Sequence, residues 1–374
     1  MIRLFFLMRA PGLGGAERQL VELVKGLDKR RFKITVATFY DGGELRPELE
    51  AISGVQLVSL RKSGRWDVLP FLWRLWRLAS KIRPHIMHGY LDMANILSLL
   101  VGKSVSARVV WGLRASNMDF SRYDWAATWG YRAAAPLSRF ADMIIVNSHM
   151  GKQHNIARGF HARRMVMIHN GIDTERFRPD PRLGGEMRKR WGIADGELLI
   201  GLVARLDPMK DHPTFLRAVS LLAGQHEARF VCVGGGPDKY KRSMRTLANE
   251  LGLGEHLVWA GAVSEMPAVY NALDIACSAS SYGEGFSNSI GEAMSCGVPC
   301  VVTDVGDSSL ILGGTGEVIP PNDPHALAAA LARLAKLPCE ERSALGRQAR
   351  ERIVSEYSVA QLARKTEAAL LRLL

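Results

Sequence analysis

Two glutamates, Glu284 and Glu292, are separated by seven residues in the stretch 281–297, which is rich in small and polar side chains. Glycines at 283 and 285 predict an irregular turn, and the apolar spacing after them predicts a helix that ends at the last glycine of the stretch. We therefore expect Glu284 on the loop and Glu292 inside the helix, about two turns further on. Carboxylates accept hydrogen bonds from neighbouring hydroxyls, which suits a sugar or a ribose. A capped surface helix with solvated glutamates is the alternative.

The start of the expected helix offers a second kind of chemistry. The peptide N–H groups of Phe286, Ser287 and Asn288 would lie in its first turn, directly after Gly285. A helix start presents N–H donors and partial positive charge, and therefore suits an anionic or polyhydroxyl ligand.

The wording Glu-Gly-Phe-Ser-Asn-Ser-Ile-Gly-Glu-Ala-Met-x-Cys-Gly-x-Pro resembles the Glu-x7-Glu element of the retaining glycosyltransferases of family 4, which have the two-domain GT-B fold. In that family the second glutamate binds the ribose of the donor nucleotide, which implies this role for Glu292. The first glutamate and the backbone after it hold the donor sugar. The resemblance places beside the sugar Glu284, Gly285, Phe286, Ser287 and Asn288.

Arg205 and Lys210 follow the first expected strand of the second half of the chain. An arginine offers a planar fork for phosphate oxygens and a lysine a point charge, although two cations in a surface loop are also common. The pair resembles the Arg-x4-Lys pair of the family, which binds the donor diphosphate and stabilises the leaving nucleotide. The sequence contains no Asp-x-Asp, so we expect no metal site. We also expect no cofactor, and a nucleoside diphosphate sugar as the donor substrate.

Three glycine-containing turns carry further expected contacts. The loop with Gly14 and Gly15 follows the first strand, but it lacks the third glycine of a dinucleotide fingerprint, which disfavours a nicotinamide cofactor. It resembles the N-terminal loop of the family, which lines the cleft against the donor phosphates or the acceptor. The resemblance also places the backbone at Gly235 beside the nucleotide and that at Val263 beside its base.

His88 and Arg114 are candidate catalytic residues of the first half. We expect His88 to end a strand and Arg114 to follow the next one, although a histidine at a strand end is often only a satisfied polar residue. Family members commonly carry a histidine that contacts the transferred sugar where Arg114 stands here. The resemblance also implies same-face attack, in which the leaving phosphate takes the proton of the acceptor.

Apolar runs alternate with helical patterns along all 374 residues, which predicts an α/β protein with two doubly wound, Rossmann-like domains facing a central cleft. We expect an acceptor-binding domain over 1–178, a nucleotide-sugar-binding domain over 179–356, and a C-terminal helix over 357–374 that packs back on the first domain. The expected strands are residues 2–8, 32–39, 55–60, 85–88, 107–111, 143–146, 165–168, 198–204, 229–233, 257–260, 275–277 and 298–303.

Charge is unevenly distributed along the chain. Residues 1–178 hold 28 Lys and Arg against 14 Asp and Glu, whereas 179–374 hold 21 against 23. The stretch from Arg61 to Lys81 places tryptophans among cations in an amphipathic helical pattern, with Arg74 on a cationic face and Trp76 on an apolar one. Cations beside tryptophan in such a helix suit a membrane–water interface. An ordinary crossover helix with a solvated face is the alternative, and no recognised nucleic-acid-binding module accompanies the charge.

These features favour a metal-independent retaining glycosyltransferase that acts in surface glycan biosynthesis. We expect a UDP-linked sugar as donor and a lipid-linked or polysaccharide hydroxyl as acceptor. Five cysteines, expected as buried free thiols, favour a cytoplasmic protein, peripheral at the inner face of the membrane. The alternatives are a nucleotide-sugar epimerase of the same fold and a non-catalytic protein that binds sugar nucleotides.

Overall fold

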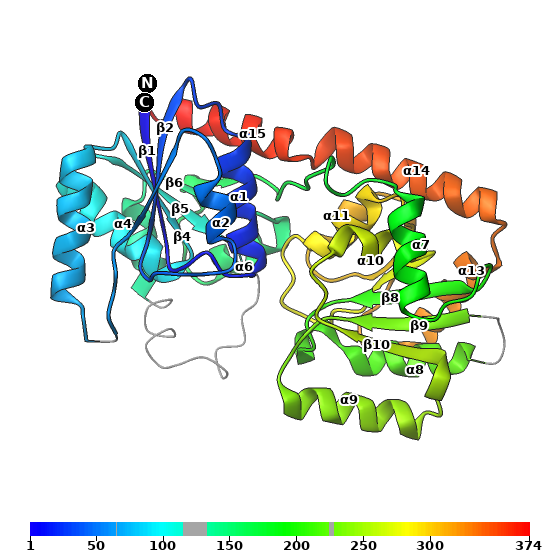
Figure 1. Cartoon of the computed structure of the whole chain (residues 1–374). Helices are drawn as coiled ribbons and strands as arrows, with labels where there is room; N and C mark the ends of the chain where they lie inside the picture. The colour runs from blue at the N-terminus through cyan, green and yellow to red at the C-terminus, as the bar shows by residue number, and fades with distance from the viewer. Residues whose placement is uncertain (65, 115–132, 224–227) are drawn as a thin grey trace. The chain divides into compact units, whose positions relative to one another are not determined.

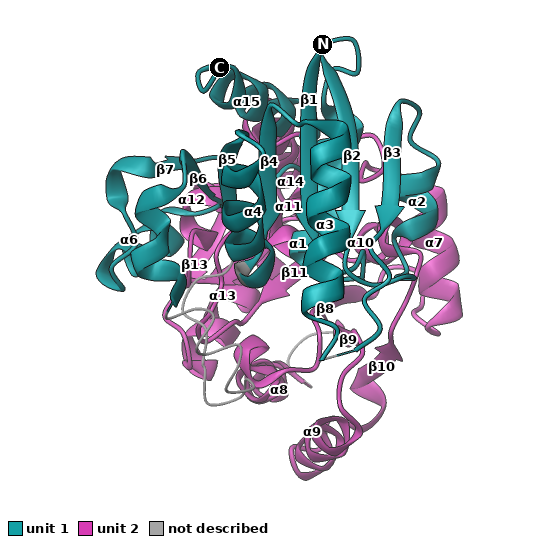
Figure 2. Ribbon diagram, turned by 90° about the vertical axis from the view of Figure 1, so that its left-hand side faces the viewer, with its two compact units in different colours: residues 1–171, 359–374 teal, residues 172–358 magenta. Residues whose placement is uncertain are grey.

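The computed structural model describes residues 1–64, 66–114, 133–223 and 228–374 (Figure 1). The chain forms two compact units, which Figure 2 distinguishes by colour. Unit 1 comprises Met1–Gly171 together with Val359–Leu374, and unit 2 comprises Ile172–Ser358. Each unit is an α/β structure with a parallel sheet of its own.

The boundaries of the units follow their hydrophobic cores. The segment 172–178, which we expected in the first domain, falls in unit 2, because Ile172 and Phe177 are buried in the core of that unit. At the other end of unit 2, Tyr357 is buried in the same core. The last helix begins two residues after Tyr357 and belongs to unit 1.

Unit 1 contains a seven-stranded parallel sheet with the strand order β3-β2-β1-β4-β5-β6-β7. Alternate residues of the first strand pack on opposite faces, with Leu4 and Phe6 in one core cluster and Phe5 and Leu7 in another, so helices cover both faces. All seven strands overlap the ranges that apolar runs predicted, although several of their ends differ. They are β1 (Ile2–Met8), β2 (Phe32–Thr38), β3 (Val55–Ser59), β4 (Ile86–Tyr90), β5 (Arg108–Leu113), β6 (Met143–Val146) and β7 (Met165–Met167).

The C-terminal helix packs on the first helix within unit 1. The side chain of Ala363 lies so close to Gly26 that a Cβ added to this glycine would be 2.9 Å from the Ala363 Cβ. The described helices of unit 1 are α1 (Gly15–Gly26), α2 (Arg46–Glu50), α3 (Leu69–Ile82), α4 (Asp92–Ser104), α6 (His149–Ala157) and α15 (Val359–Leu371).

Unit 2 contains a six-stranded parallel sheet with the strand order β10-β9-β8-β11-β12-β13. The strands are β8 (Leu198–Val203), β9 (Ala228–Val233), β10 (Leu257–Gly261), β11 (Ile275–Ser278), β12 (Cys300–Thr303) and β13 (Gly316–Ile319). The helices are α7 (Pro181–Arg190), α8 (His212–Leu222), α9 (Asp238–Glu250), α10 (Met266–Ala272), α11 (Asn288–Ser295), α12 (Ser308–Leu312), α13 (Pro324–Lys336) and α14 (Cys339–Glu356).

Both sheets reverse their strand order at one point. Strand β1 lies between β2 and β4, and β8 lies between β9 and β11. Loops at the carboxyl ends of such strands diverge, and ligands of open α/β sheets bind there. The ligand-binding residues of each unit are therefore expected in the loops that follow these strands.

All five cysteines are free thiols; four are buried and Cys339 is exposed. Among the described residues, no helix has both the length and the apolar composition that crossing a bilayer requires.

Candidate functional site

An ion pair between Lys210 and Glu284 forms the centre of the candidate site in unit 2. Lys210 ends a short turn after β8, and Glu284 lies in the loop after β11, as predicted. The Lys210 ammonium contacts Oε1 of Glu284, and the hydroxyl of Ser280 donates to the same oxygen at 2.8 Å. Because β8 and β11 are neighbours in a parallel sheet, their carboxyl ends bring these two side chains together.

Glu284 is buried, with 7% of the residue exposed. Burial acts to raise the pKa of Glu284, but the positive charge of Lys210, hydrogen bonds from Lys210 and Ser280, and the more weakly felt charge of Arg205 outweigh burial and lower it. Glu284 is therefore ionised at neutral pH. A buried carboxylate and ammonium in contact keep a fixed geometry, which is what a site that positions a charged substrate requires.

Backbone contacts hold the turn that carries Lys210. The carboxylate of Asp207 accepts a hydrogen bond from the Met209 N–H at 2.9 Å, and the Met209 carbonyl accepts one from the Ser281 N–H at 2.9 Å. Asp211 then takes a left-handed conformation, with φ of 46°, and caps α8. The ammonium is thus presented by a turn that is fixed at both ends and tied to the loop of Glu284.

Arg205 and Gly235 occupy adjacent loops after β8 and β9. Arg205 is exposed, and its neighbour Leu206 donates its N–H to the Gly235 carbonyl at 2.8 Å. The close approach of these two loops requires glycine at position 234, since a Cβ at Gly234, where φ is +150°, would lie 1.9 Å from the Ala204 carbonyl oxygen. Gly235 itself has room for a Cβ, with Ala262 3.5 Å away.

The loop after β10 is joined to the same edge of the sheet. The Gly234 N–H donates to the Gly261 carbonyl at 2.7 Å. Val263 is half-buried and packs against the core of unit 2. The backbone segments at Gly235 and Val263 therefore lie along neighbouring strand ends of one sheet, together with Arg205.

Helix α11 begins at Asn288, with Ser287 as its N-cap, and it carries Glu292 in its interior as predicted. The loop before it is held tightly, because the Gly285 carbonyl accepts a hydrogen bond from the Asp307 N–H at 3.0 Å. Phe286 is buried, and its ring lies 5.4 Å from that of Tyr357. The loop that carries Glu284 is therefore anchored in the core of unit 2 through Phe286.

Two partners of the glutamates were not predicted from the sequence. The buried Tyr270 in α10 donates its hydroxyl to Oε2 of Glu292 at 2.9 Å. Burial and then the negative charge of Glu292 raise the pKa of Tyr270 well above its usual value, so the hydroxyl stays protonated. The other missed partner is Ser280. The Tyr270 contact joins two helices that pack together although the residues are 22 positions apart in the sequence. Ser280 lies only four residues before Glu284 in the same loop, and neither residue belongs to a local motif.

Tyr270 should fix the orientation of the Glu292 carboxylate. We expect Tyr270→Phe, which keeps the ring in place, to weaken binding of a nucleoside diphosphate about 10-fold, since hydrogen bonds to charged groups contribute about 1.5–3 kcal/mol. The measurement is calorimetric titration of the variant and the wild type. In a Glu292→Gln background the same substitution should cause little further loss; an equal loss in both backgrounds would show that Tyr270 acts independently of Glu292.

The candidate residues of unit 1 lie around Arg114, directly after β5 as predicted. Arg114 donates from Nη2 to the Tyr90 hydroxyl at 2.6 Å and from Nη1 to Oδ1 of Asn170 at 3.2 Å. Asn147 donates to the same Asn170 oxygen at 3.4 Å. Motif residues 115–117, which follow Arg114, lie outside the described residues.

The expectation that His88 ends a strand is wrong. Strand β4 continues to Tyr90, and His88 is completely buried, with no hydrogen-bond partner for either ring nitrogen among the residues that the structure describes. Burial, and next to it the charge of Arg114, lower the pKa of His88 to about 3. A neutral imidazole without exposed surface is a core residue, so we leave His88 out of the catalytic set proposed below.

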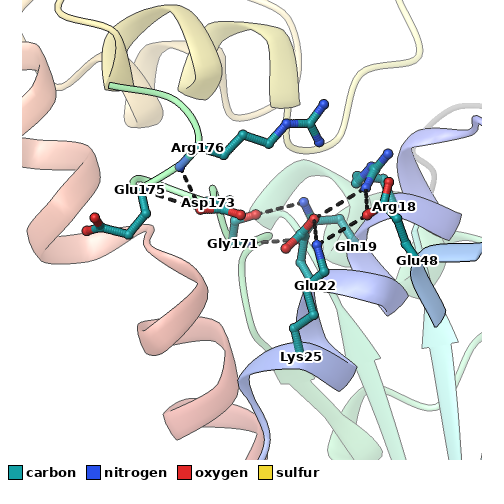
Figure 3. Close-up of polar contacts among 9 residues, drawn as sticks. All are labelled: Arg18, Gln19, Glu22, Lys25, Glu48, Gly171, Asp173, Glu175 and Arg176. Atoms are coloured by element: carbon teal, nitrogen blue, oxygen red, sulfur yellow. Dashed lines mark hydrogen bonds and ion pairs between the residues drawn. The ribbon is translucent and has the colours of Figure 1, made fainter. Parts of the chain in front are cut away.

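Gly14 and Gly15 lie at the start of α1, where both are exposed. Further along this helix, the buried Gln19 side chain exchanges two hydrogen bonds with Gly171, at 2.8 Å and 2.7 Å (Figure 3). On another side of the helix Arg18 pairs with Glu48 at 2.6 Å. These contacts fix α1 in unit 1 and with it the glycine loop at its N-terminus.

Comparison with known sequences connects both units to one family. Residues 185–352 match the family described as "Glycosyl transferases group 1", and residues 13–176 match "Glycosyltransferase Family 4". The chain is 26% identical over 339 residues to the GDP-mannose-dependent alpha-(1-6)-phosphatidylinositol monomannoside mannosyltransferase of Mycolicibacterium smegmatis, which covers 87% of this chain and 86% of that protein. It is 28% identical over 357 residues to the D-inositol 3-phosphate glycosyltransferase of Thermomonospora curvata, covering 86% and 82%.

Solved structures agree on the fold. The crystal structure of Anabaena HepE in complex with UDP-glucose matches with a TM-score of 0.86 and 20% identity over 100% of both chains. Sucrose-phosphate synthase from Thermosynechococcus elongatus matches with a TM-score of 0.82 and 18% identity over 100% of this chain and 99% of the other. The predicted GT-B fold is confirmed. The chain belongs to glycosyltransferase family 4 and is a nucleotide-sugar-dependent glycosyltransferase.

Proposed function

We propose that this glycosyltransferase moves a sugar, with retention of configuration, from a nucleoside diphosphate sugar to a hydroxyl of a lipid-linked or polysaccharide acceptor in surface glycan biosynthesis. The observation that carries the proposal is the buried Lys210–Glu284 ion pair at the carboxyl edge of the unit 2 sheet. Arg205 lies in the loop after the same strand as Lys210.

Each group has a role that its chemistry supports. Arg205 and Lys210 bind the donor diphosphate, and Glu292, oriented by Tyr270, binds the ribose. Glu284 holds the donor sugar, as do the backbone segments of Gly285, Phe286, Ser287 and Asn288. Gly235 and Val263 lie along the nucleotide. In unit 1, Gly14 and Gly15 serve the phosphates or the acceptor, and Arg114 contacts the sugar.

The proposed reaction needs no enzyme nucleophile. The acceptor oxygen attacks the anomeric carbon on the face that the leaving group departs from, the bond from that carbon to the phosphate oxygen breaks, and the acceptor proton passes to the leaving phosphate. Charge that develops on the phosphate is stabilised by the cations at Arg205 and Lys210, an effect worth several kcal/mol in such sites. We propose that this charge stabilisation takes the place of a metal ion.

The identity of the donor nucleotide sugar can be decided by one ligand screen. The UDP-glucose complex of HepE supports a UDP-linked donor, and the name of the M. smegmatis relative supports GDP-mannose. We favour the UDP-linked sugar and propose a thermal-shift screen against UDP-, GDP- and ADP-sugars, followed by product analysis with the stabilising donor. Release of nucleotide with a glycosylated acceptor supports the proposal. An epimerised donor without acceptor would indicate an epimerase, and binding without turnover on any acceptor a non-catalytic protein.

We further propose a cytoplasmic location with peripheral membrane contact through helix α3 and the loop before it. Trp66, Trp73 and Trp76 are 90%, 55% and 47% exposed, and the Arg77 guanidinium lies 5.1 Å from the Trp73 ring centre. Exposed tryptophans beside cations suit the headgroup region of an anionic bilayer. Arg65 of this stretch lies outside the described residues.

The structure corrects two details of the expected α3 pattern. Trp76 was expected on the apolar face of the helix, but it is half exposed, and the buried positions are Phe71, Leu75 and Ala79. Arg74 was expected on the solvated cationic face, but it pairs with Asp67. The exposed surface of α3 is consequently more aromatic than its sequence pattern indicates.

We expect Trp73→Ala/Trp76→Ala to abolish flotation of the protein with phosphatidylglycerol liposomes, because the variant loses both interfacial anchors of the helix. The measurement is the floating fraction at low and high salt. Phe140→Ala is the matched control, since Phe140 is also an exposed aromatic of unit 1 and packs under Arg139. Failure of the wild type to float at either salt concentration would exclude this contact.

A further inference from the structure

A buried positive charge with no acidic partner among the described residues lies in unit 1. Arg114 is only 9% exposed, and its two hydrogen-bonded partners, Tyr90 and Asn170, are both uncharged. Its guanidinium carbon also lies 4.8 Å from the centre of the Tyr90 ring. The Nε atom is buried and has no partner among the described residues. A buried cation is costly unless an anion accompanies it, and the described part of the chain provides no such anion here.

The two described titratable groups beside Arg114, Tyr90 and His88, do not supply that charge. Burial raises the pKa of Tyr90, against a smaller opposing effect of Arg114, so its hydroxyl stays neutral. His88, whose ring centre lies 5.2 Å from that of Tyr90, is also neutral, because its pKa is about 3. The cluster consequently carries the full positive charge of Arg114 at neutral pH.

The cluster lies where a substrate of this fold would meet unit 1. Tyr90 is the last residue of β4, and Arg114 directly follows the neighbouring strand β5. The carboxyl edge of a doubly wound sheet is its ligand-binding edge. Charge, burial and position therefore agree that this edge of the sheet suits an anionic ligand group.

We propose that Arg114, Tyr90 and Asn170 form a binding site for an anionic group of a substrate, a carboxylate or a phosphate. Arginine binds both groups through two parallel N–H donors, and Nε with a terminal nitrogen provides such a pair. This inference rests on the proposed function. Under that function the anion has two candidate sources, which are the carboxylate of a uronic acid sugar on the donor and a phosphate on the acceptor.

The test compares donors that differ only at this group. The wild type and Arg114→Gln are titrated calorimetrically with UDP-glucuronate and UDP-glucose, and with GDP-mannuronate and GDP-mannose. A third arm adds inorganic phosphate to the protein saturated with UDP or GDP. Arg108→Gln is the matched control, because Arg108 begins the same strand and pairs with Asp142 at its opposite end.

A donor carboxylate is the anion if the wild type binds a uronate donor about 10-fold more tightly than its neutral counterpart and Arg114→Gln abolishes the preference. A phosphate on the acceptor is the anion if inorganic phosphate binds to the wild type and to Arg108→Gln but not to Arg114→Gln. Tyr90→Phe, which keeps the ring under the guanidinium, should reduce the same preference, and it replaces Arg114→Gln if that variant does not fold.

Equal behaviour of the wild type, Arg114→Gln and Arg108→Gln in every arm would overturn the anion site. Loss of nucleotide binding altogether would have a different meaning. UDP and GDP binding depends on the groups of unit 2, so its absence from the wild type would refute the proposed function. The two failures are therefore distinguishable in one set of titrations.

Discussion

Replacing Lys210 with alanine should lower kcat/KM for the donor by about 10³-fold, the largest effect expected of any substitution in this chain. Lys210 acts on the leaving diphosphate, and it also pairs with the buried Glu284, whose pKa it helps to lower. The substitution removes charge stabilisation from the transition state and leaves a buried carboxylate without its cation. Steady-state kinetics with the donor identified by the thermal-shift screen provide the measurement.

A control for this substitution lies in the same unit. Lys239→Ala removes an exposed lysine from helix α9 and should leave kcat/KM unchanged. Because breaking a buried pair costs about 3–5 kcal/mol of stability, the melting temperature of Lys210→Ala must be measured alongside its kinetics. A folded Lys210→Ala enzyme with wild-type kinetics would remove Lys210 from the diphosphate site.

Glu284→Ala should show the second-largest effect, and it should appear in kcat. We expect sugar transfer to fall by about 10²-fold, because the carboxylate that positions the sugar is lost, while affinity for the free nucleoside diphosphate changes little. Kinetics with the full donor and calorimetry with the nucleoside diphosphate separate the two quantities.

Glu292→Gln provides the contrast to Glu284→Ala, since its ribose role predicts weaker nucleotide binding as the main result. The two glutamates come from one motif but have different surroundings: Glu284 contacts a cation, and Glu292 accepts a hydrogen bond from a neutral tyrosine. If the glutamates exchanged behaviour, with Glu284→Ala losing nucleotide affinity and Glu292→Gln losing only transfer, the assigned roles would be reversed.

Most strands could be predicted because both faces of each sheet are buried, so that central strands are continuous apolar runs. The exception, β13 (Gly316–Ile319), has the sequence Gly-Glu-Val-Ile, and only its last residue is buried. It lies at the edge of the unit 2 sheet, where one side is unpaired and little apolar sequence is needed. The end of β4 was predicted too early, at His88, because Gly89 and Tyr90 look like a turn but continue the strand.

Only those features of the site that depend on local motifs could be predicted from the sequence. The loop position of Glu284 and the helical position of Glu292 follow from nearby glycines and apolar spacing, and both were predicted. Tyr270 and Asn170 could not be predicted, since each acquires its partner through the packing of distant segments rather than through a motif. Ser280 is close to Glu284 in the sequence, but the turn that brings its hydroxyl to the carboxylate belongs to no motif. The charge environment of Arg114 likewise depends on side chains 24 and 56 residues away in the sequence.

The most direct test of the nucleotide-sugar site in unit 2 is calorimetric titration of the wild type and Lys210→Ala with a nucleoside diphosphate, the corresponding monophosphate and the free nucleoside. We predict that the wild type binds the diphosphate most tightly and that Lys210→Ala loses this preference while it still binds the nucleoside. Equal affinity of the wild type for all three compounds, or an undiminished diphosphate preference in Lys210→Ala, would contradict the account.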